Sequence, residues 1–416
     1  MSAATGSQEP ETSAAQQGPA IGGPSGRLRV LHLGFEDPRM PGAGGGSVRT
    51  HEINKRLVAD GHHVTVLTTG YPGAVERWQD GVQYVPLGFG QGRTKLSRLL
   101  GYVLRLPGEV RRRRSTCDLV VEDFFAPFST MAAPLWTRKP TIAVVQWLHA
   151  KDKSRQYGLP FHLVERVGVR AHSRMVAVSC GTAEALQALN QRAHIDVIGN
   201  GLDPRALEVR PQLGRDVVYI GRLEMLCKGL DLLLQAWERA HQDVDGDLVI
   251  VGAGPDEELV RRMVRDSGLE ESIRFTGWVD GADKFQLLSN ARLAVIPSRH
   301  ETFGLVAIEA LATGTPTVAF DIPCLREVVP SGCGWLVEPF DAASLATEIV
   351  LRYNRPKELE DAGRTGREFA TRFDWDALAS QQTAAYRAAI PMLPAARWKF
   401  MPIMRKEGIH GSSRTP

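Results

Sequence analysis

The sequence of 416 residues contains few cysteines and no long apolar run. Its cysteines form no C-x-x-C pair and have no histidine at metal-ligand spacing, which argues against a disulfide framework and a zinc site and favours a reducing, cytoplasmic compartment. They are Cys117, Cys180, Cys227, Cys324 and Cys333. No apolar run reaches the roughly 18 to 20 residues needed to cross a bilayer. Residues 1–26 lack the basic start and apolar core of a signal peptide, and we expect a disordered extension there.

An excess of charge of one sign is also missing. The 50 lysines and arginines are balanced by 47 aspartates and glutamates, which leaves a formal charge of +3. This balance gives no general attraction to polyanions, so nucleic acid is not an expected partner. The length exceeds that of one ordinary hydrophobic core and predicts two domains.

Strand-like apolar runs alternate with helical patterns along most of the chain, as in parallel sheets flanked by helices. The first series lies at 27–34, 62–69, 118–124, 141–148, 175–179 and 194–200. The second lies at 215–221, 247–254, 272–279, 292–298, 315–321 and 334–339. A polar segment with two prolines and two glycines separates the two series and is typical of a linker.

This pattern predicts two Rossmann-like, doubly wound α/β domains facing each other across a cleft. The first spans 27–205 and the second 206–372. We expect a helix at 373–390 that packs back on the first domain, and a loosely ordered tail at 391–416.

A glycine-rich turn, PGAGGGSVRT at 41–50, follows the first predicted strand and opens a helix. A dinucleotide-binding G-x-G-x-x-G would need glycine at position 47, where Ser47 stands, and an acidic residue near Thr68 and Thr69. Both departures count against a dehydrogenase, and VGAGPDE at 251–257 fails the same spacing. A tight turn alone would explain one glycine, but Gly44, Gly45 and Gly46 together favour close approach by a phosphate.

Two glutamates frame the stretch RHETFGLVAIEA, residues 299–310. Glu301 follows a buried-type strand, where ligands of parallel α/β sheets bind, and Glu309 lies in an otherwise apolar helix. A buried carboxylate needs hydrogen-bond donors, which the hydroxyls of a ribose or sugar supply. The amides of Phe303, Gly304 and Leu305 at the helix start suit a phosphate. The alternative is that both glutamates are surface or capping groups.

Arg222 follows a strand, and Lys228 begins an apolar helix six residues later. Together they suit a diphosphate and the negative charge of a departing nucleoside diphosphate. Taken alone, both would be ordinary solvated cations.

In combination, these residues resemble the family 4 glycosyltransferases of the GT-B architecture over about residues 27–390. The E-x7-E motif of that family is matched by Glu301 and Glu309, its basic pair by Arg222 and Lys228, and its hinge segment by NGLD at 200–203. Its glycine loop is matched by Gly44, Gly45 and Gly46.

The resemblance implies that Glu301 holds the transferred sugar, Glu309 the ribose, and Arg222 with Lys228 the diphosphate. It places His149 beneath the donor sugar, and it places three further residues beside the base. These are Gly277, Trp278 and Val279.

The implied reaction moves a hexose from a UDP- or GDP-sugar to a hydroxyl of a glycan, glycolipid or natural product with retention of configuration and without a metal or other cofactor. Asp243, Asp245 and Asp247 precede a strand and so lie at the wrong edge of the sheet for a metal-binding D-x-D pair. Glu122 and Asp123 end a strand of the first domain and are candidate acceptor contacts, or else helix caps. Two alternatives are a nucleotide-sugar epimerase of the same fold and a catalytically silent binding protein.

A basic amphipathic segment at 94–114 is a candidate for peripheral contact with an anionic membrane, at the inner face. It carries Leu96, Leu99, Leu100, Val103 and Leu106 between cations that include Arg111 to Arg114. Pro107 is expected to interrupt its helix. The alternative is that one face packs on the first sheet while the arginines remain solvated.

Overall fold

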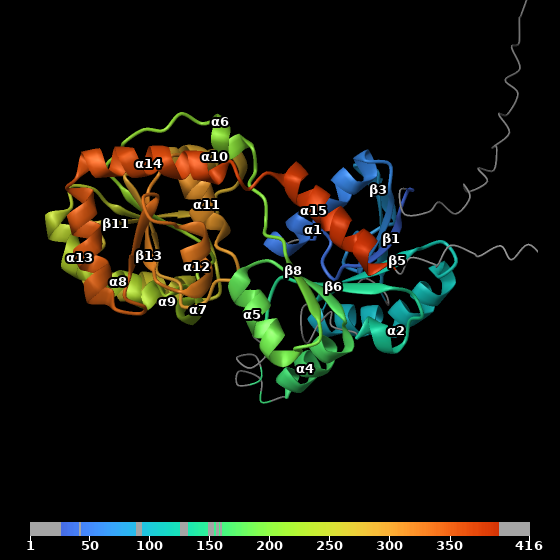
Figure 1. Ribbon diagram of the computed structural model, residues 1–416. Coiled ribbons are helices and arrows are strands. Elements are labelled where there is room, and N and C mark those ends of the chain that lie inside the picture. The colour runs from blue at the N-terminus through green and yellow to red at the C-terminus, as the bar shows by residue number, and fades with distance from the viewer. Residues whose placement is uncertain are drawn as a thin grey trace, which may run out of the picture.

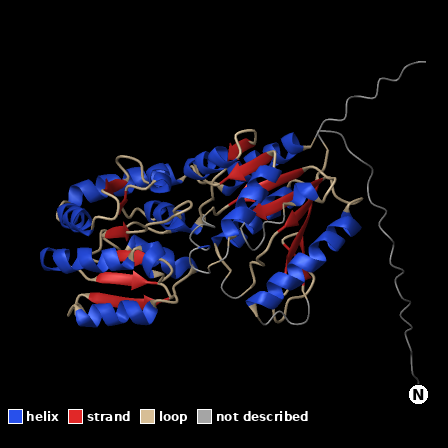
Figure 2. Ribbon diagram, turned by 90° about the horizontal axis from the view of Figure 1, so that it is seen from below, coloured by secondary structure: helices blue, strands red, loops and turns tan. Residues whose placement is uncertain are grey.

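The computed structural model describes residues 26–40, 43–88, 94–124, 132–148, 154, 158 and 160–390, without the side chains of Lys95 and Leu96. It has two lobes, each with a central sheet (Figure 1). Helices cover both faces of each sheet (Figure 2). This arrangement confirms the predicted α/β architecture of two Rossmann-like domains. Within the described ranges, no helix is long and apolar enough to cross a membrane.

The N-terminal lobe is built on an eight-stranded sheet, counted over the described residues. In spatial order its strands are β3 (Arg77–Gln79), β4 (Val82–Leu87), β2 (His63–Thr69), β1 (Arg29–Leu33), β5 (Leu119–Phe124), β6 (Thr141–Val145), β7 (Arg174–Ala177) and β8 (His194–Val197). All neighbouring pairs are parallel except β3 with β4. Strands β3 and β4 escaped the sequence analysis because β3 is very short and β4 contains Pro86, which breaks the apolar alternation.

Two helical layers enclose this sheet. Helices α1 (Gly45–Ala59) and α15 (Trp375–Ala389) pack on one face, where Ile53 and Leu378 share a core with Val30 and Val64. The opposite face is covered by α2 (Lys95–Arg113), the short 3-10 helix η1 (Ala133–Leu135), α4 (Phe161–Ala171) and α5 (Cys180–Leu189).

Helix α2 differs from the expectation in two respects. It continues through Pro107, which is exposed, so water can bond the carbonyl that the proline leaves without a partner. Its buried apolar side chains in the core are Tyr102, Leu106 and Val110, whereas Leu100 is 47% exposed. Of the predicted stripe only Leu106 is among these buried side chains, so the face that packs on the sheet is displaced in part from the prediction.

The C-terminal lobe contains a sheet of six parallel strands. In spatial order they are β11 (Ile273–Gly277), β10 (Leu248–Val251), β9 (Val217–Ile220), β12 (Leu293–Ile296), β13 (Thr317–Phe320) and β14 (Gly334–Val337). The helices are α6 (Arg205–Glu208), α7 (Met225–Lys228), α8 (Leu230–Ala240), α9 (Glu257–Asp266), α10 (Gly281–Ser289), α11 (Leu305–Ala312), α12 (Pro323–Val328), α13 (Ala342–Tyr353) and α14 (Pro356–Ala370), with a 3-10 helix η2 (His241–Asp243) after α8.

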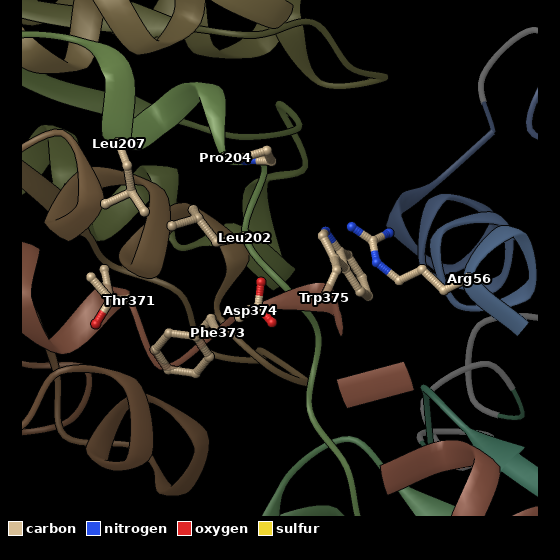
Figure 3. A pocket seen from close by; sticks show the side chains of 9 residues that line it. Arg56, Leu202, Pro204, Leu207, Thr371, Phe373, Asp374 and Trp375 are labelled. Atoms are coloured by element: carbon tan, nitrogen blue, oxygen red, sulfur yellow. The ribbon is translucent and has the colours of Figure 1, made fainter. Parts of the chain in front are cut away.

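The chain crosses between the lobes twice, and the two crossings lie side by side. The Leu202 amide donates to the carbonyl of Phe373 at 2.7 Å. A side chain at Gly201 would place its Cβ 2.2 Å from the Trp375 ring, so this position requires glycine. A hollow between the crossings is lined by Leu202, Trp375 and Arg56 of α1, among others (Figure 3). Helix α15 thus joins the N-terminal lobe as soon as it begins.

Candidate active site

Glu301 lies just beyond the end of β12 and contacts the Lys228 ammonium of α7 through its carboxylate. The Ser298 hydroxyl donates to the same carboxylate oxygen at 2.9 Å. Gly229 ends α7 with a left-handed φ of 66°, and a Cβ there would lie 1.9 Å from the Pro297 carbonyl. Because only glycine permits this approach, α7 lies against the end of β12 and Lys228 reaches Glu301.

The Lys228–Glu301 pair is largely removed from water, with the two side chains 23% and 17% exposed. Burial disfavours the Lys228 ammonium, but the neighbouring carboxylate outweighs this effect and raises the pKa of the lysine. The thiol of Cys324 donates to the Glu301 carbonyl at 3.1 Å, and burial raises the pKa of this thiol to about 12. The cysteine therefore remains a neutral donor beside a fixed ion pair.

Glu309 lies on α11 and points to a second cation. Its carboxylate accepts from Lys284 of α10 at 2.7 Å, and its side chain is 13% exposed. Burial raises the pKa of Glu309, while Lys284 opposes the rise and the carboxylates of Asp203 and Asp280 add to it. Lys284 is thus the group that favours an ionised Glu309.

Arg222 follows β9 and remains accessible, with a side chain 61% exposed. Its backbone is held by the Tyr219 hydroxyl, which donates to the Arg222 carbonyl at 3.1 Å. Its guanidinium lies 3.7 Å from Glu224, too far for a strong hydrogen bond. The structure therefore brings Lys228 and Glu301 together and leaves Arg222 solvated near them.

The segment predicted to lie beside a base, residues 277–279, connects β11 to α10. Gly277 has a left-handed φ of 74°, and a Cβ added there would meet open space. Trp278 is 69% exposed, whereas Val279 packs on the core. Since α10 also carries Lys284, this segment leads directly into the helix that holds Glu309.

The glycine loop of the N-terminal lobe lies opposite the start of α11. A Cβ at Gly45 would lie 3.1 Å from the Leu305 side chain, and one at Gly46 would lie 3.2 Å from Gln146. The Gly44 amide donates to Glu36 at 3.0 Å. Gly304, the N-cap of α11, has a φ of 86°. The two backbone segments proposed to receive phosphate oxygens therefore face each other across the lobes.

The amide of Phe303 was predicted to bind a phosphate, but its side chain has a structural role. Its ring is buried, packs edge-to-face on Phe373 at 5.8 Å, and lies where a Cβ at Gly199 would approach to 2.7 Å. This side chain therefore ties the loop before α11 to the crossing between the lobes.

Of the predicted acceptor contacts, Glu122 is fully buried and its carboxylate accepts from the Ala133 amide at 2.8 Å and lies 3.2 Å from His172. Its surroundings make it a structural group, because it presents no surface to an acceptor. Asp123 is more accessible and bonds His32 and the Thr50 hydroxyl at 2.9 Å each. His149 lies outside the described residues.

The aspartates before β10 lie at the edge of the sheet opposite Glu301. Asp247 pairs with Arg274 at 3.0 Å, and its amide donates to Asp216. Asp243 ends the 3-10 helix η2. These contacts agree with a solvated turn.

Three residues that contact the site were not predicted from the sequence: Lys284, Ser298 and Gln146. Ser298 stands three residues before Glu301, so proximity in sequence was a usable signal. Lys284 and Gln146 carried no such signal. Lys284 approaches Glu309 only through the packing of α10 on α11, and Gln146, just after β6, donates to the Gly46 carbonyl of α1, which is distant in sequence.

Comparison with known proteins gives matches over both lobes. Residues 43–206 match the model of glycosyltransferase family 4, and residues 214–354 match that of the glycosyl transferases group 1. A glycogen synthase of Mycobacterium tuberculosis is 28% identical over 401 residues, which cover 87% of this chain and 95% of the relative.

Two solved structures share the fold. A sucrose-phosphate synthase from Thermosynechococcus elongatus superposes with a TM-score of 0.75 at 22% identity, over 87% of this chain and 99% of that one. The Anabaena protein Alr3699/HepE, solved in complex with UDP-glucose, gives a TM-score of 0.67 at 20% identity, over 87% and 100%. The two family matches and the two-lobed fold together establish that this chain belongs to the family 4 glycosyltransferases of the GT-B architecture.

Proposed function

We propose that this glycosyltransferase moves a hexose from a nucleotide diphosphate sugar, with a uridine or guanosine base, to a hydroxyl acceptor. The observation that carries the proposal is the convergence at one edge of the C-terminal sheet. There, Glu301 with Lys228 and Glu309 with Lys284 form two ion pairs, and the exposed Arg222 and Trp278 follow the ends of β9 and β11 at the same edge. A nucleotide sugar has a matching sequence of hydroxyls, phosphates, ribose and base.

Each group has a distinct task in this proposal. The Glu301 carboxylate accepts hydrogen bonds from the sugar hydroxyls, and that of Glu309 accepts from the ribose. Arg222 and Lys228 offset the charge that grows on the departing diphosphate, aided by the amides at the start of α11. The glycine loop allows the diphosphate to approach the backbone of the other lobe. His149 is assigned to the face of the donor sugar by family resemblance.

The proposed transfer retains the configuration of the anomeric carbon. The bond from this carbon to the diphosphate oxygen breaks while the acceptor oxygen bonds to the same face. The proton of the acceptor hydroxyl passes to the leaving diphosphate. Lysine and arginine supply the positive charge in this scheme, so it calls for no metal or other cofactor.

The acceptor is proposed to enter from the N-terminal lobe, with Asp123 as a contact. Helix α2, within the predicted segment 94–114, is proposed to touch an anionic membrane that carries a glycolipid acceptor. Support comes from Arg111, Arg112 and Arg114, which are all exposed.

A panel of UDP-, GDP- and ADP-sugars screened for protection against thermal unfolding tests the donor class. A bound donor at 100 times its dissociation constant adds about 2.7 kcal/mol to the free energy of unfolding. The same panel is then applied to two variants, and their rates of sugar transfer are measured as well. Glu309→Ala is expected to weaken donor binding. Glu301→Ala is expected mainly to depress turnover. Wild-type transfer by both variants, or protection by none of the sugars, would overturn the site assignment. The anomeric coupling constant of the product, measured by NMR, tests retention.

A further inference from the structure

The outer face of the helical layer formed by α2, η1 and α4 carries several exposed apolar side chains. These three elements cover one side of the N-terminal sheet, next to one another, with α2 and η1 sharing one core and α4 contacting η1. Their outward side chains include six large aliphatic groups that are between 43% and 69% exposed. They are Leu100, Leu104, Leu135, Leu163, Val164 and Val167.

Among the described residues of positions 94–171, the same outer face carries exposed positive charge and no exposed negative charge. Five arginines there are exposed and have no ion-pair partner within the described ranges. They are Arg111, Arg114, Arg138, Arg166 and Arg170. The acidic residues described between positions 94 and 171 are all buried or half-buried. They are Glu109, Asp118, Glu122, Asp123 and Glu165.

Helix α4 combines both features on adjacent stripes. Leu163 and Val167 are one helical turn apart, and so are Arg166 and Arg170 beside them. The only acidic residue of this helix, Glu165, faces inward. Helix α9 of the other lobe provides a contrast: it exposes Leu259, Arg262 and Arg265, but it exposes Glu258 and Asp266 as well.

We propose that this outer face docks on an anionic lipid bilayer, with Leu163, Val164 and Val167 of α4 entering the headgroup boundary and Arg166 and Arg170 contacting lipid phosphates. Aliphatic side chains beside unpaired cations are the requirements for interfacial binding. Single-stranded nucleic acid instead calls for exposed aromatic rings among the cations, and the six exposed groups here are aliphatic.

This inference extends the membrane contact proposed for α2 and assigns the apolar part of the contact chiefly to α4 and η1. The reason is that Tyr102, Leu106 and Val110 of α2 are buried in the core. Of the leucines described in this helix, only Leu100 and Leu104 are strongly exposed. It concerns how the enzyme meets a surface and does not depend on which donor or reaction is correct.

Cosedimentation of the full chain with vesicles tests the proposal. Vesicles of phosphatidylcholine alone are compared with vesicles of equal parts phosphatidylcholine and phosphatidylglycerol. We expect wild-type protein to bind the anionic vesicles only. The double variant Arg166→Gln/Arg170→Gln is expected to lower the partition coefficient about thirtyfold, at about fivefold per arginine. Leu163→Ser/Val167→Ser is expected to lower it at least about tenfold.

Matched changes on α9 serve as controls. Leu259→Ser and Arg262→Gln/Arg265→Gln alter comparable exposed side chains and should leave vesicle binding unchanged. Thermal unfolding and donor protection should be unaffected in all of these variants, so a failure of the donor proposal is distinguishable. Absence of wild-type binding to anionic vesicles would overturn the inference. Unchanged vesicle binding by either α4 variant would also overturn it. So would duplex DNA that displaces the wild-type and the Leu163→Ser/Val167→Ser proteins from vesicles equally well, since that result indicates a general polyanion surface.

Discussion

Positive charge is used in opposite ways at two places: the edge of the C-terminal sheet that is proposed to bind the donor, called the donor edge, and the outer face of the N-terminal lobe. At the donor edge, Lys228 and Lys284 each contact a largely buried carboxylate. On the outer face, exposed arginines such as Arg166 and Arg170 have no carboxylate partner in the described structure. Paired, buried cations hold carboxylates in place for a ligand of fixed geometry. Unpaired, exposed cations remain available to anions whose positions vary.

The largest effect is expected when the Lys228–Glu301 pair, which is proposed to contact the departing diphosphate, is broken at its cation. Lys228→Met removes the charge that offsets the departing diphosphate and leaves Glu301 without its ion-pair partner. We expect kcat/KM for transfer to fall about 100- to 1,000-fold, measured by steady-state kinetics. Lys357→Met on α14 changes an exposed lysine and should leave the rate unaltered. A Lys228 variant within about twofold of the wild-type rate would remove this lysine from the mechanism.

The second pair predicts a change in donor affinity that depends on pH. Lys284→Met removes the cation that opposes the effect of burial on Glu309, so the pKa of this carboxyl should rise further. Donor affinity is then expected to fall about tenfold near neutral pH, and by more at lower pH, as Glu309 becomes protonated. Calorimetric titration across pH measures the effect, and Lys284→Arg should restore the wild-type profile. A uniform loss at every pH would indicate a purely structural lysine.

The sequence predicted the fold well because strong apolar runs marked most strands of both sheets. It also placed Glu301 correctly after β12, since a buried-type strand ending in charged residues has few other interpretations. The prediction failed where residues in contact are distant in sequence, and where tertiary structure overrides a local rule such as the breaking of helices by proline. Lys284 meets Glu309 through helix packing, and Pro107 continues a helix because its position faces solvent.

Glu122, a candidate acceptor contact or helix cap by sequence, illustrates the same limit. A carboxylate at the end of a parallel strand normally faces the ligand edge, but here the Ala133 amide and His172 enclose it. The two groups lie 11 and 50 positions away along the chain, and neither carries a recognisable motif. Burial of a polar group by its neighbours is a property of the packed structure and leaves no local pattern in the sequence.

Glu309 also predicts a pH dependence of stability. Burial raises its pKa above the ordinary value of 4.5, so the folded state binds a proton more tightly than the unfolded state does. This contribution to stability is fully present below the unfolded pKa and is lost as pH rises through the folded pKa. Glu309→Gln should therefore gain stability relative to wild type as pH rises from about 4 to about 8, by about 1.4 kcal/mol per unit of raised pKa.

Urea denaturation at several pH values measures this difference. Glu338→Gln, at an exposed position, is the control and should show no such trend. A constant difference between wild type and Glu309→Gln across pH would mean that Lys284 fully cancels the effect of burial.

The smallest effect is expected where the two lobes meet away from the donor edge. Glu327 of α12 accepts hydrogen bonds from the amides of Cys180 and Gly181, at 2.9 and 3.1 Å, at the start of α5 in the other lobe. A carboxylate at a helix N-terminus is favoured by the exposed amides and the helix dipole, and Glu327→Gln keeps an acceptor but loses the charge. We expect the free energy of unfolding to fall by about 0.5 to 1 kcal/mol and the lobes to separate slightly, seen as a larger radius of gyration in X-ray scattering. Helix α12 also contacts Glu301, because the Cys324 thiol donates to the Glu301 carbonyl. An unchanged radius of gyration together with an altered donor affinity would therefore mean that Glu327 acts on the donor site and not on the contact between the lobes.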